Sequence, residues 1–235
     1  MRPFSDTGDY DGRAAQLSDP CFLIRHPKGT LLWDAGIGDR VAEMKDGLAM
    51  IPGFVATVPV TLRAQLQAVG LDYDRIDYFA FSHSHGDHVG NANLLTAATW
   101  LLNEKEMNWV QSPGDPSAAL LAGYRNARTQ MIRADHDVFG DGTVVILQTP
   151  GHTPGHQSLM IRLQHSGYVI LGGDLWHQRE SFEFSHVPGF NYSRAETLAS
   201  MDRIRRIMER TGARLVIQHE LRDFTALPRF PAFLD

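Results

Sequence analysis

Histidine and carboxylate side chains gather in the stretch "SHSHGDHVGN", residues 82–91, which follows the apolar run "YFAF". His83, His85, Asp87 and His88 fall within six positions of this stretch. A strand fixes the base of such a loop while the loop exposes its side chains, and zinc accepts both imidazole nitrogens and carboxylate oxygens as ligands. A single histidine here would be read as a hydrogen-bonded loop residue, but this spacing at a strand end predicts a metal site.

Three further strand ends carry the same kinds of donor. His152 follows "VILQTPG", Asp174 follows "YVILGG" and His219 follows "LVIQ". The seven residues supply five imidazoles and two carboxylates. One zinc ion takes about four ligands, so this set suits two metal ions, roughly 3.5–4 Å apart, that share one carboxylate. The sequence therefore predicts two divalent metal ions as cofactors, with Zn favoured by these donors and Fe, Mn or Co also accepted.

Strand and helix patterns must position these loops. A hairpin is predicted over 21–36, and strands are predicted over 76–82, 99–103, 143–151, 157–163, 168–174 and 214–220. Helices are predicted over 61–70, 103–110, 117–132 and 193–212. In the last of these, Ser193 and Glu196 form a capping box and Gly212 ends the helix. The Gly- and Pro-containing segment 47–60 is predicted to be a loop. Strands mixed with helices in both halves predict an α/β or α+β sandwich.

Length and composition restrict the class of protein. The 235 residues, 43% of them hydrophobic, are enough for one domain spanning 1–235. A formal charge of −5 does not favour binding to nucleic acid or to an anionic membrane. No apolar run is long enough for a transmembrane helix, and the polar first residues do not form a signal peptide. We expect a soluble protein, cytoplasmic as given, or periplasmic or secreted if a signal peptide was removed.

The motifs "HSHGDH", "GHTPGHQS", "GGDLWH" and "IQHE", in this order, resemble those of the metallo-β-lactamase superfamily over nearly the whole chain. The resemblance implies a four-layered αβ/βα sandwich with the metals at one edge. It implies that the first metal is bound by His83, His85 and His152, and the second by Asp87, His88 and His219. Asp174 would bridge the two metals, whereas true zinc β-lactamases generally place Cys or Ser near that point.

Within the superfamily, the chain resembles the N-acyl-homoserine lactonases. It shares "DAG", a loop with Gly and Phe, a short helix, the His-rich motif and "GGD" followed three residues later by a catalytic side chain. That side chain is usually Tyr in the lactonases and is His177 here. The chain also starts after the strand that usually precedes "PFSDTGDYDG", so we expect a truncated amino terminus or a sheet edge built differently.

The resemblance implies that a hydroxide held between the metals attacks the carbonyl of a small acyl lactone. His177 would donate a hydrogen bond to the oxyanion, and Asp87 would carry the proton to the leaving alkoxide. Asp34 in "WDAG" and His156 in "GHTPGH" are expected to hold metal ligands by hydrogen bonds. Several apolar residues of the flanking loops either pack in the core or line an acyl groove: Met50, Ile51, Phe54, Trp176, Phe182, Phe184 and Phe190. The segment "SFEFSHVPGF" is predicted to be an irregular, substrate-contacting loop.

Lactone hydrolysis is the leading interpretation, and a phosphotriesterase or aryl esterase of the same superfamily is the alternative. A glyoxalase-II-like thioesterase is disfavoured because no basic cluster suits glutathione. A metal-binding or interaction protein with a vestigial site is disfavoured by the complete ligand set. The sequence leaves open the acyl-chain preference, the native metal and the presence of a homodimer.

Overall fold

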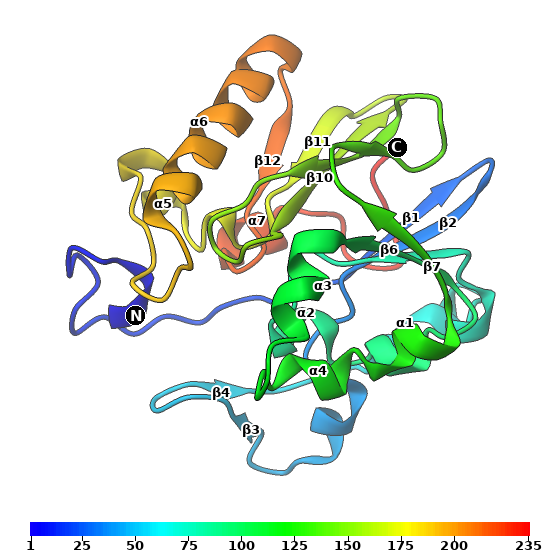
Figure 1. Ribbon diagram of the computed structural model, residues 1–235, viewed down its shortest axis with the longest axis horizontal. Coiled ribbons are helices and arrows are strands. Elements are labelled where there is room, and N and C mark those ends of the chain that lie inside the picture. Colours follow the sequence, from blue (N-terminus) through cyan, green and yellow to red (C-terminus); the bar gives the residue numbers. More distant parts are fainter. The chain divides into compact units, whose positions relative to one another are not determined.

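The computed structural model describes all residues, 1–235, and the chain divides into two compact units. Unit 1 comprises Met1–Pro20, Asn103–Met107 and Ile132–Asp235, and unit 2 comprises Cys21–Leu102 and Asn108–Met131. Each unit is built around one five-stranded sheet, and Figure 1 labels most of the helices and strands. The predicted mixed α/β class is confirmed, whereas a single domain over 1–235 stays a prediction.

The sheet of unit 2 has the strand order β1-β2-β5-β6-β7. Its strands are β1 (Phe22–His26), β2 (Gly29–Trp33), β5 (Tyr78–Ala80), β6 (Thr99–Asn103) and β7 (Arg128–Ile132). The predicted hairpin is confirmed as β1 and β2, which pair antiparallel. β2 then pairs parallel with β5, with Trp33 opposite Ala80. Because parallel strands end at the same edge of a sheet, this pairing brings the residue after Trp33 close to the His-rich loop.

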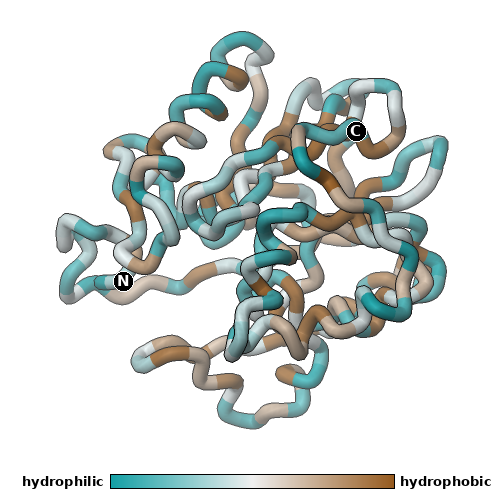
Figure 2. Tube along the Cα trace, viewed as in Figure 1, coloured by the Kyte–Doolittle hydropathy of each residue, from teal (hydrophilic) through white to brown (hydrophobic).

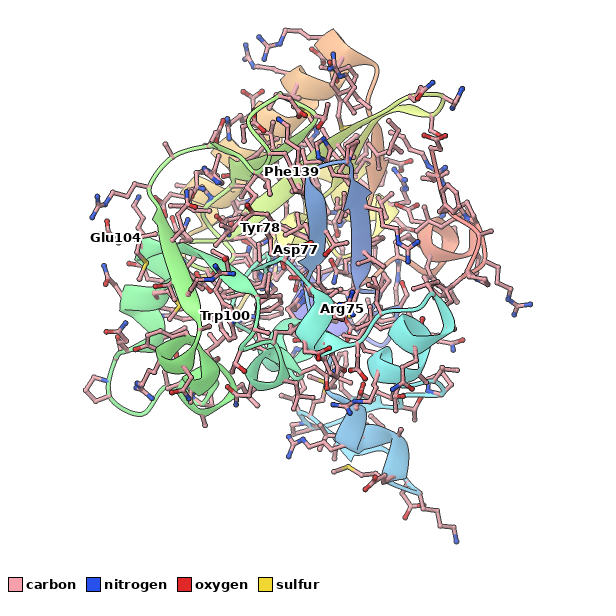
Figure 3. The ribbon with its side chains drawn as sticks, turned by 90° about the vertical axis from the view of Figure 1, so that its right-hand side faces the viewer. Arg75, Asp77, Tyr78, Trp100, Glu104 and Phe139 are labelled. Carbon is pink, nitrogen blue, oxygen red and sulfur yellow. The ribbon has the colours of Figure 1, made fainter.

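Side-chain contacts fix the register of the central strands of unit 2. Asp77, which is labelled in Figure 3, lies just before β5. Its Oδ2 accepts hydrogen bonds from Thr30 N at 2.8 Å and from Thr30 Oγ1 at 2.9 Å. Trp100 of β6 packs edge-on against Phe79 of β5, with ring centroids 4.9 Å apart. Its indole Nε1 donates to Leu95 O at 2.9 Å, so this buried ring satisfies its one donor.

Two predictions for unit 2 are corrected by the structure. The segment 117–132, predicted to be one helix, forms α4 (Ser117–Leu120), the 3-10 helix η5 (Ala122–Asn126) and the strand β7. β7 is an edge strand exposed at every position except Ile132, and pairing with β6 supplies backbone partners that local propensity does not reveal. The segment 47–60 contains a small antiparallel sheet, β3 (Leu48–Ala49) and β4 (Val55–Ala56).

Helices complete unit 2. They are α1 (Leu62–Ala68), α2 (Gly86–Val89) and the 3-10 helices η2 (Asp39–Glu43), η3 (Tyr73–Arg75) and η4 (Ala92–Leu94). α1 begins at the predicted position, where Thr61 Oγ1 accepts a hydrogen bond from Ala64 N at 3.2 Å. α3 (Glu104–Val110) continues the chain from β6 and crosses the boundary between the units.

The sheet of unit 1 has the strand order β12-β11-β10-β9-β8. Its strands are β8 (His136–Asp137), β9 (Val144–Gln148), β10 (Gln157–Leu163), β11 (Gly167–Leu171) and β12 (Arg214–Val216). β9, β10 and β11 pair antiparallel in sequence, and β11 pairs parallel with β12, with Leu171 opposite Val216. The loops after β11 and β12, which carry Asp174 and His219, therefore leave the same edge of the sheet.

The predicted helix at 193–212 is confirmed as α6 (Arg194–Thr211), capped by Ser193 and ended by Gly212 in the left-handed region. Figure 2 shows hydrophilic and hydrophobic stretches alternating along it. Its buried residues Met201 and Ile204 share a hydrophobic core with Ile170 of β11 and Leu215 of β12. Burying each such aliphatic side chain stabilises the fold by about 1.5–3 kcal/mol, so this core anchors the edge that carries the acidic and histidine loops.

Four short helices remain in unit 1: η1 (Arg2–Phe4), η6 (Gly173–Leu175), α5 (Arg179–Phe184) and α7 (Leu221–Thr225). α5 corrects the expectation that the whole stretch 181–190 is irregular, because the chain is helical as far as Phe184. No helix combines the length and the hydrophobicity that crossing a membrane requires.

Candidate metal centre

In unit 2, Asp34 holds the start of the His-rich loop. The parallel pairing of β2 with β5 places Asp34 beside Ser82, whose backbone N–H donates to Asp34 Oδ1 at 2.6 Å. Asp34 Oδ2 lies 3.0 Å from His88 Nδ1, and both side chains are fully buried. An ionised carboxylate only accepts hydrogen bonds, so this contact puts the ring proton on Nδ1 and leaves Nε2 as the ligand atom of His88.

The other two histidines of this loop converge. His83 Nε2 lies 2.8 Å from His85 Nδ1, and the ring centroids are 4.4 Å apart. His83 Nδ1 lies 3.1 Å from Ser82 Oγ. Two ring nitrogens that approach this closely fit a shared proton or a shared cation. His85 directly precedes α2, a helix of one turn that contains the half-buried Asp87.

In unit 1, Asp174 is surrounded by three imidazoles. Its Oδ1 lies 3.0 Å from His219 Nε2, and its Oδ2 lies 3.0 Å from His177 Nε2 and 3.4 Å from His152 Nε2. All four residues are buried. The ligand atoms of Asp174, His177 and His219 lie within 4.8 Å of one another. Oδ1 thus faces His219, and Oδ2 faces His152 and His177, so the two oxygens of this carboxylate meet different imidazoles.

Hydrogen bonds to the far nitrogens orient the rings of unit 1. His219 Nδ1 donates to Ser18 O at 2.8 Å, and His152 Nδ1 lies 2.8 Å from Asn191 Oδ1. In both rings the opposite nitrogen, Nε2, then faces Asp174. Ser18 and Asn191 were not predicted from the sequence, because a backbone carbonyl and an asparagine in a loop carry no signal that pairs them with a distant histidine.

His156 holds the backbone at Asp174. Its Nδ1 lies 3.0 Å from Thr149 O, and its Nε2 accepts a hydrogen bond from Asp174 N at 3.0 Å. Both ring nitrogens are therefore engaged by the protein, which fits a role in supporting Asp174 and not one in binding metal.

Aromatic rings pack around His177 and His152. The ring of Phe4 lies 4.6 Å from that of His177, and Phe190 meets the rings of His152 and His177 edge-on at 5.6 and 5.9 Å. Phe4 is buried, whereas Phe190 is 46% exposed. Phe4 was not predicted, because nothing in the amino-terminal sequence links it to a residue more than 170 positions away.

The remaining apolar candidates differ in exposure. Trp176 is 1% exposed and belongs to the core beneath α6. Phe182 packs against the same core, and the centroid of its ring lies 5.3 Å from that of the Trp176 ring. The structure thus places Trp176 in the core instead of a groove. Phe184 is 65% exposed and stacks on His186. In unit 2, the exposed Met50 and Ile51 and the half-buried Phe54 lie at the turn between β3 and β4.

The negatively charged Glu220 directly follows His219, after the end of β12. Burial alone would raise the pKa of the adjacent Glu220, but hydrogen bonds from Arg222 and from the backbone N–H groups of Arg179 and Arg222 lower this pKa to about 2. Glu220 is therefore an anion at neutral pH and caps the first turn of α7, where negative charge is favourable.

The chain belongs to the metallo-β-lactamase superfamily, whose family model matches residues 17–219. An N-acyl homoserine lactonase, AttM, of Azorhizobium caulinodans is 32% identical over 96% of this chain and 90% of its own length. An N-acyl homoserine lactonase of Bacillus thuringiensis is 25% identical over 95% of this chain and 89% of its own length. The resemblance stated from the motifs is confirmed.

Solved structures share the fold. One, an N-acyl homoserine lactone hydrolase with the product N-hexanoyl-L-homoserine at its catalytic metal center, superposes with a TM-score of 0.85 at 23% identity, over 99% of this chain and 92% of the other. A variant of AiiA from B. thuringiensis with N-decanoyl-L-homoserine at its active site gives a TM-score of 0.83 at 24% identity, over 95% and 89%. At these identities the likeness establishes the metallo-β-lactamase fold.

Proposed function

We propose that the protein is a metal-dependent N-acyl-homoserine lactonase. The observation that carries the proposal is the environment of Asp174, whose Oδ1 lies 3.0 Å from His219 Nε2 and whose Oδ2 lies 3.4 Å from His152 Nε2, the two imidazoles that we assign to different metal ions. The curated relatives that match 95% or more of the chain and bear the name of this activity supply the substrate class. A small acyl lactone is thus the proposed substrate.

We assign the predicted ligands to two divalent metal ions, most simply zinc. His83, His85 and His152 would bind one ion, Asp87, His88 and His219 would bind the other, and Asp174 would be shared. When bound, such ions lower the pKa of water and polarise a carbonyl oxygen. The hydrogen bond from His88 Nδ1 to Asp34 and that from His219 Nδ1 to Ser18 support this assignment, because they direct the Nε2 atoms toward a ligand.

His177 would donate a hydrogen bond to the oxygen that becomes negative when the lactone carbonyl is attacked. Its ring contacts both Phe4 and Phe190, which also contact each other at 5.8 Å, and it stacks on His219 at 5.5 Å, so it needs little reorganisation. The half-buried Asp87 would pass a proton to the leaving alkoxide. Phe190, half-exposed beside His177, would contact the acyl chain, and Phe184, Met50 and Phe54 are weaker candidates for the same role.

An aryl esterase or phosphotriesterase is the second candidate. The observation that favours it is again Phe190, because an exposed aromatic edge beside His177 would also pack against an aryl leaving group. The same chain residues would serve both reactions, so only the substrate profile separates the two functions.

The test is product analysis by mass spectrometry after incubation with N-hexanoyl-homoserine lactone, a p-nitrophenyl ester and a dialkyl aryl phosphate. We expect the lactone to gain one water, to re-close in acid, and to be hydrolysed faster than either aryl substrate. Chelator-treated protein should lose the activity and regain it with zinc. As a matched control, His165→Ala removes an exposed histidine in the turn after β10 and should leave the rates unchanged. Intact lactone with hydrolysed aryl substrate would replace the first candidate by the second.

A further inference from the structure

The segment 190–193 encloses His152. Phe190 packs edge-on against the His152 ring at 5.6 Å, Asn191 Oδ1 lies 2.8 Å from His152 Nδ1, and Tyr192 N donates to His152 O at 3.0 Å. One residue further, Ser193 N donates to Gly151 O at 2.8 Å. The loop that carries this proposed ligand is thus attached to the residues that start α6.

The donors and acceptors of the hydrogen bonds in this segment can be assigned in only one consistent way. Thr197 Oγ1 donates its single proton to Ser193 O at 2.8 Å, because a carbonyl can only accept. Its oxygen must then accept from Asn191 Nδ2, which lies 3.0 Å away. That contact turns Asn191 Oδ1, an acceptor, toward His152 Nδ1, so His152 must carry its proton on Nδ1.

We propose that Asn191 is a positioning residue that fixes the tautomer of His152 and so presents Nε2 as a metal ligand. His152 Nε2 lies on the side of the ring that faces Asp174 Oδ2, at 3.4 Å. An imidazole nitrogen with its electron pair and a carboxylate oxygen repel each other at this distance unless a cation lies near both. Thr197 supports this positioning role of Asn191, because the Thr197 hydroxyl determines the orientation of the Asn191 amide.

The inference rests on the proposed function for the presence of a metal ion, but its test does not use turnover. Zinc affinity is measured by competition with a chromophoric chelator for the wild type and for Asn191→Leu, Asn191→Asp and Thr197→Val. Removing the partner of a ligand histidine weakens metal binding by about 10–100-fold, which we expect of Asn191→Leu for one of the two ions. Asn191→Asp keeps the acceptor and should bind within about threefold of the wild type.

Thr197→Val keeps the shape of the side chain but removes the hydroxyl that orients the amide. We expect it to weaken zinc binding, and Thr197→Ser, which restores the hydroxyl, to recover it. In zinc-loaded protein, the ¹⁵N spectrum of labelled histidine should show a slowly exchanging Nδ1–H for His152, and exchange should accelerate in Asn191→Leu and Thr197→Val. Asn126→Leu, at an exposed position of η5, is the matched control for an Asn-to-Leu change.

Wild-type zinc affinity and proton exchange in Asn191→Leu and Thr197→Val would overturn the inference. An equal loss in Asn191→Asp and Asn191→Leu would also overturn it, because the acceptor would then be irrelevant. If Asn191→Leu fails to fold, the comparison of Thr197→Val with Thr197→Ser decides. Absence of lactone hydrolysis together with the expected affinities would remove the proposed function and leave the role of Asn191 intact.

Discussion

The approach of the His152 loop to α6 can be tested by Gly151→Ala. Gly151 has a φ of 137°, and a Cβ on it would lie 2.2 Å from Thr197 N and 2.5 Å from Thr197 Cα. Cβ atoms essentially never approach other atoms within 3.0 Å, and both of these are backbone atoms of a helix, which cannot swing aside. The loop or the first turn of α6 must therefore move, and the hydrogen bond from Ser193 N to Gly151 O is lengthened or lost.

Overpacking of this kind destabilises a fold by about 1–3 kcal/mol, and an unfavourable φ for a side-chain-bearing residue adds about 1–2 kcal/mol. The free energy of unfolding should fall by roughly 2–5 kcal/mol, which for a chain of this size lowers Tm by roughly 4–20 °C. Thermal unfolding of metal-free protein, followed by circular dichroism, measures this change without any contribution from bound metal.

Gly167→Ala is the matched control. Gly167 also has a positive φ, 72°, but a Cβ there would meet nothing within 4 Å. Only the conformational penalty of about 1 kcal/mol applies, and Tm should fall by roughly 2–4 °C. Equal melting temperatures for the two variants would refute the reasoning, because the close approach of Gly151 to Thr197 would then have no energetic consequence.

Three further predictions concern the site and the stability of unit 1. Asp174→Ala removes the proposed shared ligand, so metal analysis should find at most one tightly bound ion per chain; two ions would remove Asp174 from the bridging role. His177→Phe should retain its metal while kcat for an acyl lactone falls about 10²–10³-fold, as for loss of an oxyanion donor, and an unchanged kcat would exclude His177 from the reaction. Asp137 accepts backbone hydrogen bonds from Gly140 at 2.9 Å and Gly142 at 2.6 Å; burial opposes ionisation, but these bonds prevail and lower the Asp137 pKa below 3.8. Asp137→Asn should therefore destabilise the fold by no more than about 1 kcal/mol above about pH 4, because solvent screens this solvent-accessible carboxylate. The difference should shrink as the pH falls below 3.8 through the folded pKa, and a pH-independent difference in urea unfolding would contradict this.

The elements that the sequence predicted well are those with strong local signals. Ser193, Glu196 and Gly212 mark the ends of α6, and the apolar runs before Asp174 and His219 mark β11 and β12. These signals lie within a few residues of one another, so they can be found without the fold. The family motifs extend the same argument to the metal ligands, which stand at the ends of such strands.

The features that the sequence did not reveal depend on contacts between distant residues. His219 Nδ1 donates to a backbone carbonyl 201 positions away, and every residue offers such a carbonyl. β7 is mostly polar and exposed, and only its pairing with β6 makes it a strand. Trp176 follows a motif that suggests a functional loop, yet the side chain turns into the core beneath α6.

Metal-dependent lactone hydrolysis is tested most directly by proton release from N-hexanoyl-homoserine lactone in weak buffer, as zinc is added stepwise to chelator-stripped protein. We expect no acidification without metal, and a rate that rises with added zinc and levels off near two ions per chain, because the proposed ligands would bind two ions. Rapid acidification by fully stripped protein would contradict the metal-dependent mechanism. No acidification after complete loading would contradict the proposed lactonase activity.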